Sequence, residues 1–517
     1  MTETGARKWI ITLTVILASV IELVDTSIVN VALPQMMGNL GATLDDVGWV
    51  VTAYVVANVI VVPMTGFLSA LFGRRAYFAG SIVLFTVASF FCGHATNIWE
   101  LVAFRFVQGI GGGALLSTSQ SILVETFPPE ELGLANALFG LGVVVGPTVG
   151  PTLGGWITDN YSWPWIFYVN LPIGIVATLL TLSFIREAKH GREVGSIDWA
   201  GIGLLVVGIG SLQIFLERGE REDWFAATYI TVLAILSAVG VVGFIARELT
   251  AEHPVVDLRV LKDRSLAVGT LFTFILGFGL YSSVFIFPVF AQNLLGFTAM
   301  QTGLILLPGG VATVFMMPIV GKLLQRGFPT QLMNASGFIC FFLFTNILSR
   351  STLASGRQDF FWPLILRGAG LALLFVPLTT LALSGLRGKD IPQGAGLTNM
   401  MRQLGGSFGV ALIATYIQKR SWSHRQTLLE HVTIYDPALR ERYQAIVAGL
   451  MAKGATLVEA QQRAYAALEG MVARQTFLLT YMDAFRIVGV FFLCCIPLLL
   501  LFKRRRGERG SAPVMAH

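Results

Sequence analysis

Apolar blocks of about 20 residues recur along the whole chain. An α-helix needs about that length to cross the roughly 30 Å of hydrocarbon in a bilayer. Charged residues make up only 13% of the 517 residues, whereas a soluble domain carries roughly 25%. Lipid must therefore cover much of the surface, and the sequence predicts an all-α polytopic membrane protein without a sizeable soluble domain.

Hydropathy predicts fourteen membrane spans, with boundaries good to a few residues. They lie at about residues 10–32, 48–70, 76–94, 98–120, 133–157, 165–185, 199–216, 228–246, 267–290, 300–321, 331–348, 361–384, 397–416 and 479–502.

The distribution of lysine and arginine predicts the orientation, because short cytoplasmic loops carry an excess of both residues. With the N-terminus inside, the predicted cytoplasmic segments hold twenty of them and the short outer loops hold four. Both termini are therefore expected in the cytoplasm. The net charge of +6 then reflects orientation and anionic lipid, and no nucleic-acid partner is expected.

A weak internal repeat relates residues 108–111 in the fourth span (QGIG) to residues 367–370 in the twelfth (RGAG). The repeat predicts two parallel six-helix halves separated by two extra helices, a known plan for transporters. The expected units are an N-terminal half (1–190), a linker pair (191–250) and a C-terminal half (251–517). The last unit includes a long outer loop, 417–478, whose two amphipathic segments predict either a docking surface or a solvated helical hairpin.

Two carboxylates, Glu22 and Asp25, lie within the first span. An ionised side chain at mid-helix costs at least ~2.5–3.5 kcal/mol on insertion scales and is usually functional. Residues three apart share a helix face, and two ionised carboxylates that lie close together repel each other, which favours the binding of a proton. We expect these two residues to exchange protons; the alternative for Asp25 is a hydrogen bond that only positions a neighbouring helix.

Three further charged residues, all arginines, are predicted to lie within spans. Arg105 in the fourth span is the natural counter-charge for the carboxylates, since a buried arginine needs an anion or several carbonyls. It serves either proton coupling or a static buried pair. Arg367 and Arg402 are possible charge sites in the second half, although Arg402 lies nearer the inner end and would also fit a helix-terminal contact.

The fifth span combines glycines every four residues with two prolines. The glycines predict a smooth ridge for close helix packing, and each proline removes a backbone donor, so the helix is expected to bend or flex. This combination suits a gating element, and static packing is the alternative. The residues are Gly142, Gly146, Gly150 and Gly154 on the ridge, with Pro147 and Pro151 beside them.

The sequence argues against an enzyme. The histidines lie outside the middle of every predicted span, so an intramembrane metal or acid–base cluster is not expected. The phosphate-binding pattern GxxxxGK[ST] is also absent from the sequence. We therefore expect neither cofactor nor metal, and the energy for any transport must come from an ion gradient or from the substrate's own gradient.

Together these segments resemble the fourteen-helix drug/proton antiporters of the major facilitator superfamily, the EmrB/QacA type. Asp25 falls on the acidic residue of the family's first-span signature, and the family's fourth-span arginine, matched by Arg105, is linked to proton coupling. The fifth-span motif is the antiporter motif. The resemblance implies proton-driven export of hydrophobic drugs by alternating access, with protons, hydrophobic small molecules and the lipid bilayer as partners. The matching segments are Leu23–Pro34; Arg105, Gln108 and Gly109; Gly142, Gly146, Pro147, Gly150, Gly154 and Gly155; Trp163–Gly174; and Asn399–Gly409.

The inner loop after the second span keeps part of the superfamily's pattern: Gly66, Gly73, Arg74 and Arg75 are present, but Ala70 and Leu71 stand where an acidic and a basic residue are usual. The long outer loop is similar to that of EmrB-like members. That similarity implies an inner (plasma) membrane location, a periplasmic adaptor (an EmrA-like membrane-fusion protein) and an outer-membrane channel.

Two other functions remain open from the sequence. The chain is either a broad exporter or a dedicated exporter of one metabolite, such as a fatty acid, a siderophore or an antibiotic. A membrane sensor or scaffold that transports nothing is the alternative from a different class.

Overall fold

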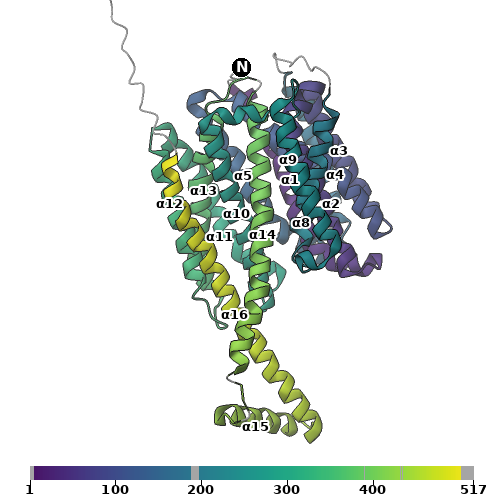
Figure 1. Cartoon of the computed structure of the whole chain (residues 1–517), viewed down its shortest axis with the longest axis vertical. Helices are drawn as coiled ribbons and strands as arrows, with labels where there is room; N and C mark the ends of the chain where they lie inside the picture. The colour runs from purple at the N-terminus through teal and green to yellow at the C-terminus, as the bar shows by residue number, and fades with distance from the viewer. Residues whose placement is uncertain (1–4, 188–196, 389, 431, 434, 502–517) are drawn as a thin grey trace, which may run out of the picture.

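The computed structural model describes residues 5–187, 197–388, 390–430, 432–433 and 435–501. Within these residues every regular element is a helix. Long helices run side by side in one bundle, and a helical arm projects from one end of it (Figure 1).

The helices of residues 5–184 form one side of the bundle. The long helix α1 packs against α4, α5 and α7, while α4 also packs against α2 and α3. A capping box at Thr43 and Asp46 begins α2, and Asn97 caps α4. The helices are α1 (Gly5–Leu40), α2 (Leu44–Phe72), α3 (Arg74–His94), α4 (Ile98–Thr126), α5 (Leu132–Asn160), α6 (Trp165–Tyr168) and α7 (Asn170–Phe184), with the short η1 (Pro129–Glu131) before α5.

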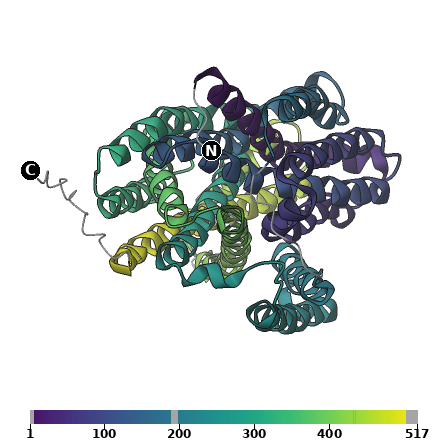
Figure 2. The same ribbon diagram turned by 90° about the horizontal axis from the view of Figure 1, so that it is seen from above.

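Two helices, α8 (Trp199–Arg218) and α9 (Thr228–Thr250), pack against each other, with the short η2 (Trp224–Ala226) between them. Figure 2 shows this pair at the periphery of the bundle, where α8 contacts α2 and α14. Asp198 caps α8 and also accepts hydrogen bonds from Arg247 of α9, at 2.9 and 3.2 Å. These bonds from Arg247 hold the pKa of Asp198 below its usual value.

The remaining helices form the other side of the bundle. Here α10 packs against α13 and α14, and α12 packs against α13 and α16. The helices are α10 (Arg264–Asn293), α11 (Ala299–Gln325), α12 (Thr330–Leu348), α13 (Phe361–Leu383), α14 (Asp390–Glu430), α15 (Pro437–Ala452) and α16 (Leu457–Cys495), with η3 (Leu258–Lys262), η4 (Arg357–Phe360) and η5 (Pro497–Leu501) as short turns.

Each expected span overlaps an observed helix, although α6 and α7 divide the sixth and α1, α14 and α16 extend well beyond the expected bounds. Among the described residues, thirteen helical segments are long and apolar enough to cross a membrane. The thirteenth expected span, on α14, is not one of them. Its polar residues Asn399, Arg402 and Gln403 lower its hydropathy, and the first two are buried inside the bundle.

The two sides of the bundle meet through a few helix pairs. On one side α5 packs against α11 and α13, and on the other α2 and α4 pack against α14. At Gly396 of α14, an added Cβ would lie 3.0 Å from the carbonyl oxygen of Val62 on α2, so the two backbones approach closely there.

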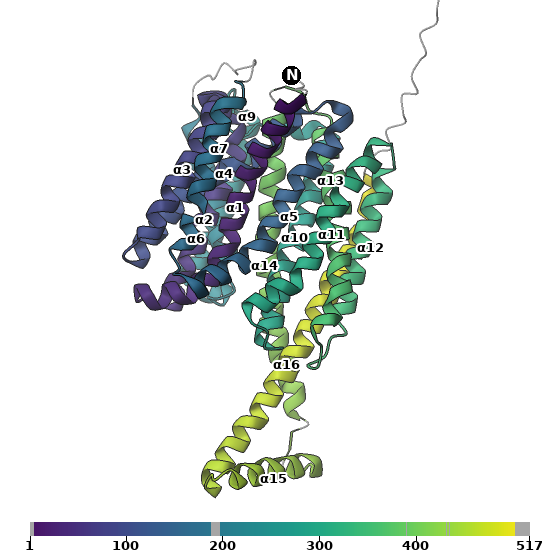
Figure 3. The same cartoon turned by 180° about the vertical axis from the view of Figure 1, so that it is seen from behind.

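The arm consists of the end of α14, the helix α15 and the beginning of α16 (Figures 1 and 3). The prediction of two helical segments within residues 417–478 is confirmed, whereas their place on the outer side of the membrane stays a prediction. Arg420 and His424 of α14 contact Asp483 of α16, with nitrogen–oxygen distances of 2.8 and 2.9 Å. All sixteen residues of α15 are described and none of them is buried, so α15 presents its surface outside the bundle.

Candidate functional site

Asp25 lies fully buried on α1 and accepts hydrogen bonds from three side chains. Arg105 Nη1 on α4 is 2.5 Å from Asp25 Oδ2. Gln108 Nε2, one turn further along α4, and Asn170 Nδ2, at the start of α7, are 2.9 and 2.7 Å from Asp25 Oδ1. A carboxylate with a guanidinium and two amide donors has both oxygens satisfied, which a charge in a low-dielectric interior requires.

Arg105 is itself held by several groups besides Asp25. Its Nε donates to the carbonyl oxygen of Val50, at 3.2 Å, and its Nη1 to Gln108 Oε1, at 2.7 Å. The ring of Tyr54 lies 4.1 Å from the guanidinium carbon, a cation–π contact. The charge is thus compensated from α1, α2 and α4. A coupling role and a static pair both require this contact, so the role of Arg105 stays a prediction.

Glu22, one turn before Asp25 on α1, has a different environment. Its Oε1 accepts a hydrogen bond from Asn58 Nδ2 on α2, at 3.0 Å. Among the described residues, its Oε2 has no hydrogen-bond partner although the side chain is only 2% exposed. The two carboxylates therefore do not share one set of partners: Asp25 bonds to α4 and α7, and Glu22 to α2.

Polar side chains of α14 continue from Glu22 across the bundle. Gln403 Nε2 donates to Asn58 Oδ1, at 2.8 Å, and Asn399 Nδ2 donates to Gln120 Oε1 on α4, at 2.7 Å. Arg402 is 1% exposed and lies well inside α14, so it is not a helix-terminal contact. Asn399 and Gln403 thus hydrogen-bond α14 to α4 and α2, and the buried Arg402 lies between them in the sequence.

Arg367 on α13 is buried but is not placed near either carboxylate. Its Nε donates to Ser283 Oγ on α10, at 3.0 Å. Within the described part of the chain, no ion pair of Arg367 is found. The structure therefore pairs Asp25 with Arg105, places Glu22 one turn away on α1 beside Asn58, and leaves Arg367 as a separate charge.

The glycine ridge of α5 faces α1, the helix of the two carboxylates. A Cβ added at Gly146 would lie 2.5 Å from Leu23 Cβ, and one at Gly154 would lie 2.8 Å from Ile28 Cγ1. A Cβ at Gly150 would lie closer still to its neighbour, Ser27 Oγ, whereas Gly142 and Gly155 leave more room. Because α5 stays helical through Pro147 and Pro151, the smooth ridge runs along most of the contact with α1.

The opposite side of α5 faces the other half of the bundle. A Cβ at Gly133 would lie 3.0 Å from the carbonyl oxygen of Gly321 on α11. The helix that carries the predicted antiporter motif therefore sits between α1 and α11.

The inner-loop motif joins helix ends. Gly73 ends α2 and begins α3 with a φ of +82°, a conformation that favours glycine. Arg74 forms an ion pair with Glu125 at the end of α4 and donates to the carbonyl oxygen of Arg186, at 3.0 Å. Arg75 donates to the carbonyl oxygen of Leu182 near the end of α7.

At the same end of the bundle, the connection between α4 and α5 is acidic and has no lysine or arginine of its own. Basic residues of other helices neutralise its charge. Glu125 pairs with Arg74, and Glu131 pairs with Lys8 of α1. Gly66 lies against the other half, since a Cβ there would be 2.8 Å from Gln393 Cδ of α14.

Neutral amides are the residues that sequence reasoning missed. Asn58, Asn170 and Gln403 bond directly or through one neighbour to the buried carboxylates. Their signal is an amide within an apolar span, since a buried amide must find partners. Within the described residues, no group of three histidine, cysteine or acidic side chains that would hold a metal ion is present.

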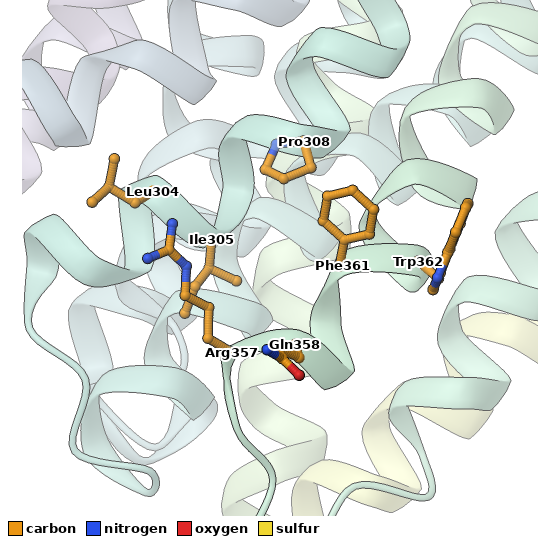
Figure 4. A pocket seen from close by; sticks show the side chains of 7 residues that line it. All are labelled: Leu304, Ile305, Pro308, Arg357, Gln358, Phe361 and Trp362. Carbon is orange, nitrogen blue, oxygen red and sulfur yellow. The ribbon is translucent and has the colours of Figure 1, made fainter.

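A separate pocket of about 540 Å³ lies between α11, η4 and α13 (Figure 4). Arg357 and Gln358 are its polar lining residues. The charged cluster of Glu22, Asp25 and Arg105 contributes nothing to its lining, which consists of Leu304, Ile305, Pro308, Arg357, Gln358, Phe361 and Trp362.

Comparison with known proteins places this geometry in a family. The sequence model of the Major Facilitator Superfamily matches residues 15–410 of the chain. The chain belongs to this superfamily. The "Fatty acid resistance protein FarB" of Neisseria gonorrhoeae is 35% identical over 96% of each chain, and the "Multidrug export protein EmrB" of Escherichia coli (strain K12) is 34% identical over 98% of each.

Solved structures of the superfamily share the fold. The human organic anion transporter MFSD10 superposes with a TM-score of 0.59 at 14% identity, covering 95% of this chain and 100% of its own. The proton:xylose symporter XylE gives 0.59 at 13% identity, covering 95% and 96%. As a member of the Major Facilitator Superfamily, the chain is a transporter and not an enzyme, and it is a multi-pass protein of the inner (plasma) membrane.

Proposed function

We propose that the chain is a proton-driven antiporter that exports hydrophobic drugs or toxic small molecules across the inner membrane by alternating access. Fourteen spans with both ends in the cytoplasm would divide into two six-helix halves, 1–190 and 251–517, around the linker pair 191–250. The boundary near residue 190 and residues 502–517 lie outside the described residues.

The buried pair of Asp25 and Arg105 is the observation that carries the proposal. A charged pair inside a membrane bundle costs desolvation energy, so a packed apolar pair would serve stability as well or better. A proton that binds Asp25 removes its charge and leaves Arg105 without a counter-ion, which destabilises this arrangement. Protonation of one carboxylate would thereby favour a different packing of α1, α4 and α7.

The fifth helix would transmit this change. Its glycine ridge contacts α1 at Leu23 and Ile28, on either side of Asp25 in the sequence, and Gly133 contacts α11 in the other half. Smooth glycine surfaces let helices slide with few side-chain clashes. A shift of α1 would thus alter the contact between the halves, with Gly142, Gly146, Pro147, Gly150, Pro151, Gly154 and Gly155 as the gating segment.

A second candidate is a dedicated exporter of one metabolite. The observation that favours it is the 35% identity to a protein named for fatty acid resistance. A panel of toxic compounds tested on cells that express the chain separates the two functions. Resistance to many unrelated compounds supports drug export, whereas protection against a single compound supports the dedicated function.

The projecting arm supports a place in a tripartite pump. Both α14 and α16 extend beyond the bundle, and the exposed α15 joins them (Figure 3). A membrane-fusion adaptor in the periplasm and an outer-membrane channel would then complete the export path.

Efflux of a fluorescent lipophilic dye from cells that express the chain tests the proposal. We expect export to collapse with a protonophore and in Asp25→Asn, a variant that keeps an oxygen for Gln108 and Asn170 but loses the charge. Glu22→Gln should have a milder effect. Full export in Asp25→Asn, at equal protein in the membrane, would refute the proposed coupling site.

A further inference from the structure

A buried arginine and a buried glutamate, Arg402 and Glu22, face the contact between the halves, and both side chains are incompletely hydrogen-bonded. Among the described residues, neither Nε nor Nη2 of Arg402 has a hydrogen-bond partner, and Glu22 Oε2 has none either. The side chains are 1% and 2% exposed. A buried donor or acceptor without a partner costs free energy, and more so when it is charged, so such atoms call for a partner that a ligand would supply.

The residues around Arg402 come from both halves and include a carboxyl group, a tyrosine and a phenylalanine. Tyr281 on α10 hydrogen-bonds to the Arg402 side chain, and Glu22 on α1 lies close enough to interact electrostatically with the guanidinium. The ring of Phe375 on α13 lies 5.7 Å from the guanidinium carbon. The neighbouring Gln403 bonds to Asn58, the same residue that donates to Glu22.

Asp25 and Glu22 differ in how completely their carboxyl oxygens are hydrogen-bonded. Asp25 has three donors, one of them the guanidinium of Arg105. Because Arg105 also donates to the Val50 carbonyl and to Gln108, it has little capacity for a ligand. Glu22 has one donor, and the two unbonded nitrogens of Arg402 do not bond to it. Two nitrogens of the Arg402 guanidinium, Nε and Nη2, therefore remain available as donors at a position surrounded by residues of both halves.

On the basis of the function proposed above, we propose that Arg402 binds the head group of an amphipathic organic anion, a carboxylate with an apolar tail, and that Glu22 competes with this anion as an internal counter-charge. A guanidinium matches the two oxygens of a carboxylate with parallel hydrogen bonds. Tyr281 and Phe375 offer apolar ring surface next to the head group. When an anion is absent, Glu22 supplies part of the negative potential at Arg402.

Equilibrium binding to the full chain in phosphatidylcholine nanodiscs tests the proposal without a proton gradient and without anionic lipid. The probes are decanoate and its neutral isostere decanol. We expect decanoate to bind more tightly than decanol. Arg402→Gln should weaken decanoate binding by about tenfold or more, the equivalent of one lost charge-assisted interaction, and change decanol binding by less than about twofold.

Matched variants exclude a general loss of structure. Glu22→Gln should tighten decanoate binding, because it removes the internal anion, and Arg402→Lys should retain part of the affinity. Arg218→Gln, at another buried arginine on α8, should leave decanoate binding unchanged. Thermal unfolding in the same nanodiscs checks that each variant is folded; if Arg402→Gln is not, the preference of the wild type for decanoate and the effect of Glu22→Gln decide.

Equal weakening of decanoate and decanol in Arg402→Gln, or no preference for decanoate in the wild type, would overturn the anion site. Proton-coupled dye export together with either result would leave the proposed function standing alone. Decanoate binding that depends on Arg402 in a chain without proton-coupled export would support the site and refute the proposed function.

Discussion

Replacing Gly146 with alanine is expected to push α5 away from α1 and to impair both stability and export. The added Cβ would lie 2.5 Å from Leu23 Cβ and 3.0 Å from the Leu23 carbonyl carbon. Carbon atoms pack at about 3.5–4.0 Å, so the helices must separate by roughly 1 Å. Overpacking of this kind typically costs about 1–3 kcal/mol.

Two neighbouring glycines give matched controls on the same helix. A Cβ at Gly155 would have its nearest contact at 3.9 Å, and one at Gly142 would have it at 3.4 Å. Both distances are ordinary van der Waals contacts. Gly155→Ala should therefore leave the packing of α5 on α1 and the unfolding midpoint unchanged, and Gly142→Ala should lower the midpoint only slightly.

Thermal unfolding of the purified variants, together with dye efflux at equal expression, measures the two consequences. The expected order of damage is Gly146, then Gly142, then Gly155. A Gly146→Ala variant with the unfolding midpoint and export rate of the wild type would refute the argument that close packing of α5 on α1 matters. Equal damage from Gly155→Ala would show that the effect does not follow the contact distances.

Two further predictions concern charges at the helix ends. Arg74→Gln and Glu125→Gln should each reduce export, and the double variant should be no worse than Arg74→Gln, which loses both the ion pair and the hydrogen bond to the Arg186 carbonyl oxygen; additive losses of efflux rate would contradict this. The Arg247 hydrogen bonds lower the pKa of Asp198 in the folded state, so their stabilisation is complete at neutral pH and is lost as pH falls below about 4 towards the folded pKa. The unfolding midpoint of Asp198→Asn should therefore lie below that of the wild type at pH 7 and approach it at pH 3, and a gap that widens in acid would disprove the explanation.

The apolar spans could be predicted from sequence because the physics that defines them is local. A helix in hydrocarbon satisfies its own backbone hydrogen bonds, so span length and hydropathy suffice without knowledge of any neighbour. The glycine ridge of α5 is local in the same sense, since a four-residue spacing places residues on one helix face. The contact of Asp25 with Arg105 follows from the rule that a buried charge needs a counter-charge.

The partners of Glu22 could not be predicted in this way. Residues three apart on a helix point about 60° away from each other around the axis. That angle is enough for Asp25 to reach α4 and α7 while Glu22 reaches Asn58 on α2. Which helix stands in each direction depends on tertiary packing, which the sequence pattern of α1 does not contain.

The length and polarity of α14 show a similar limit. Its inner residues Asn399, Arg402 and Gln403 make it less apolar than the other long helices. A hydropathy profile records this polarity but not its direction. In the fold, Asn399 and Gln403 bond to helices of the other half, so the polar face serves the contact between the halves.

Proton movement that depends on substrate tests the central claim most directly. Purified chain in proteoliposomes with a trapped pH indicator is given a lipophilic cationic dye, and the internal pH is recorded with the wild type and with Asp25→Asn. The account predicts dye-dependent proton flux in the wild type and none in Asp25→Asn, although the dye still moves down its own gradient. Equal dye-dependent proton flux in both would contradict the assignment of proton coupling to Asp25.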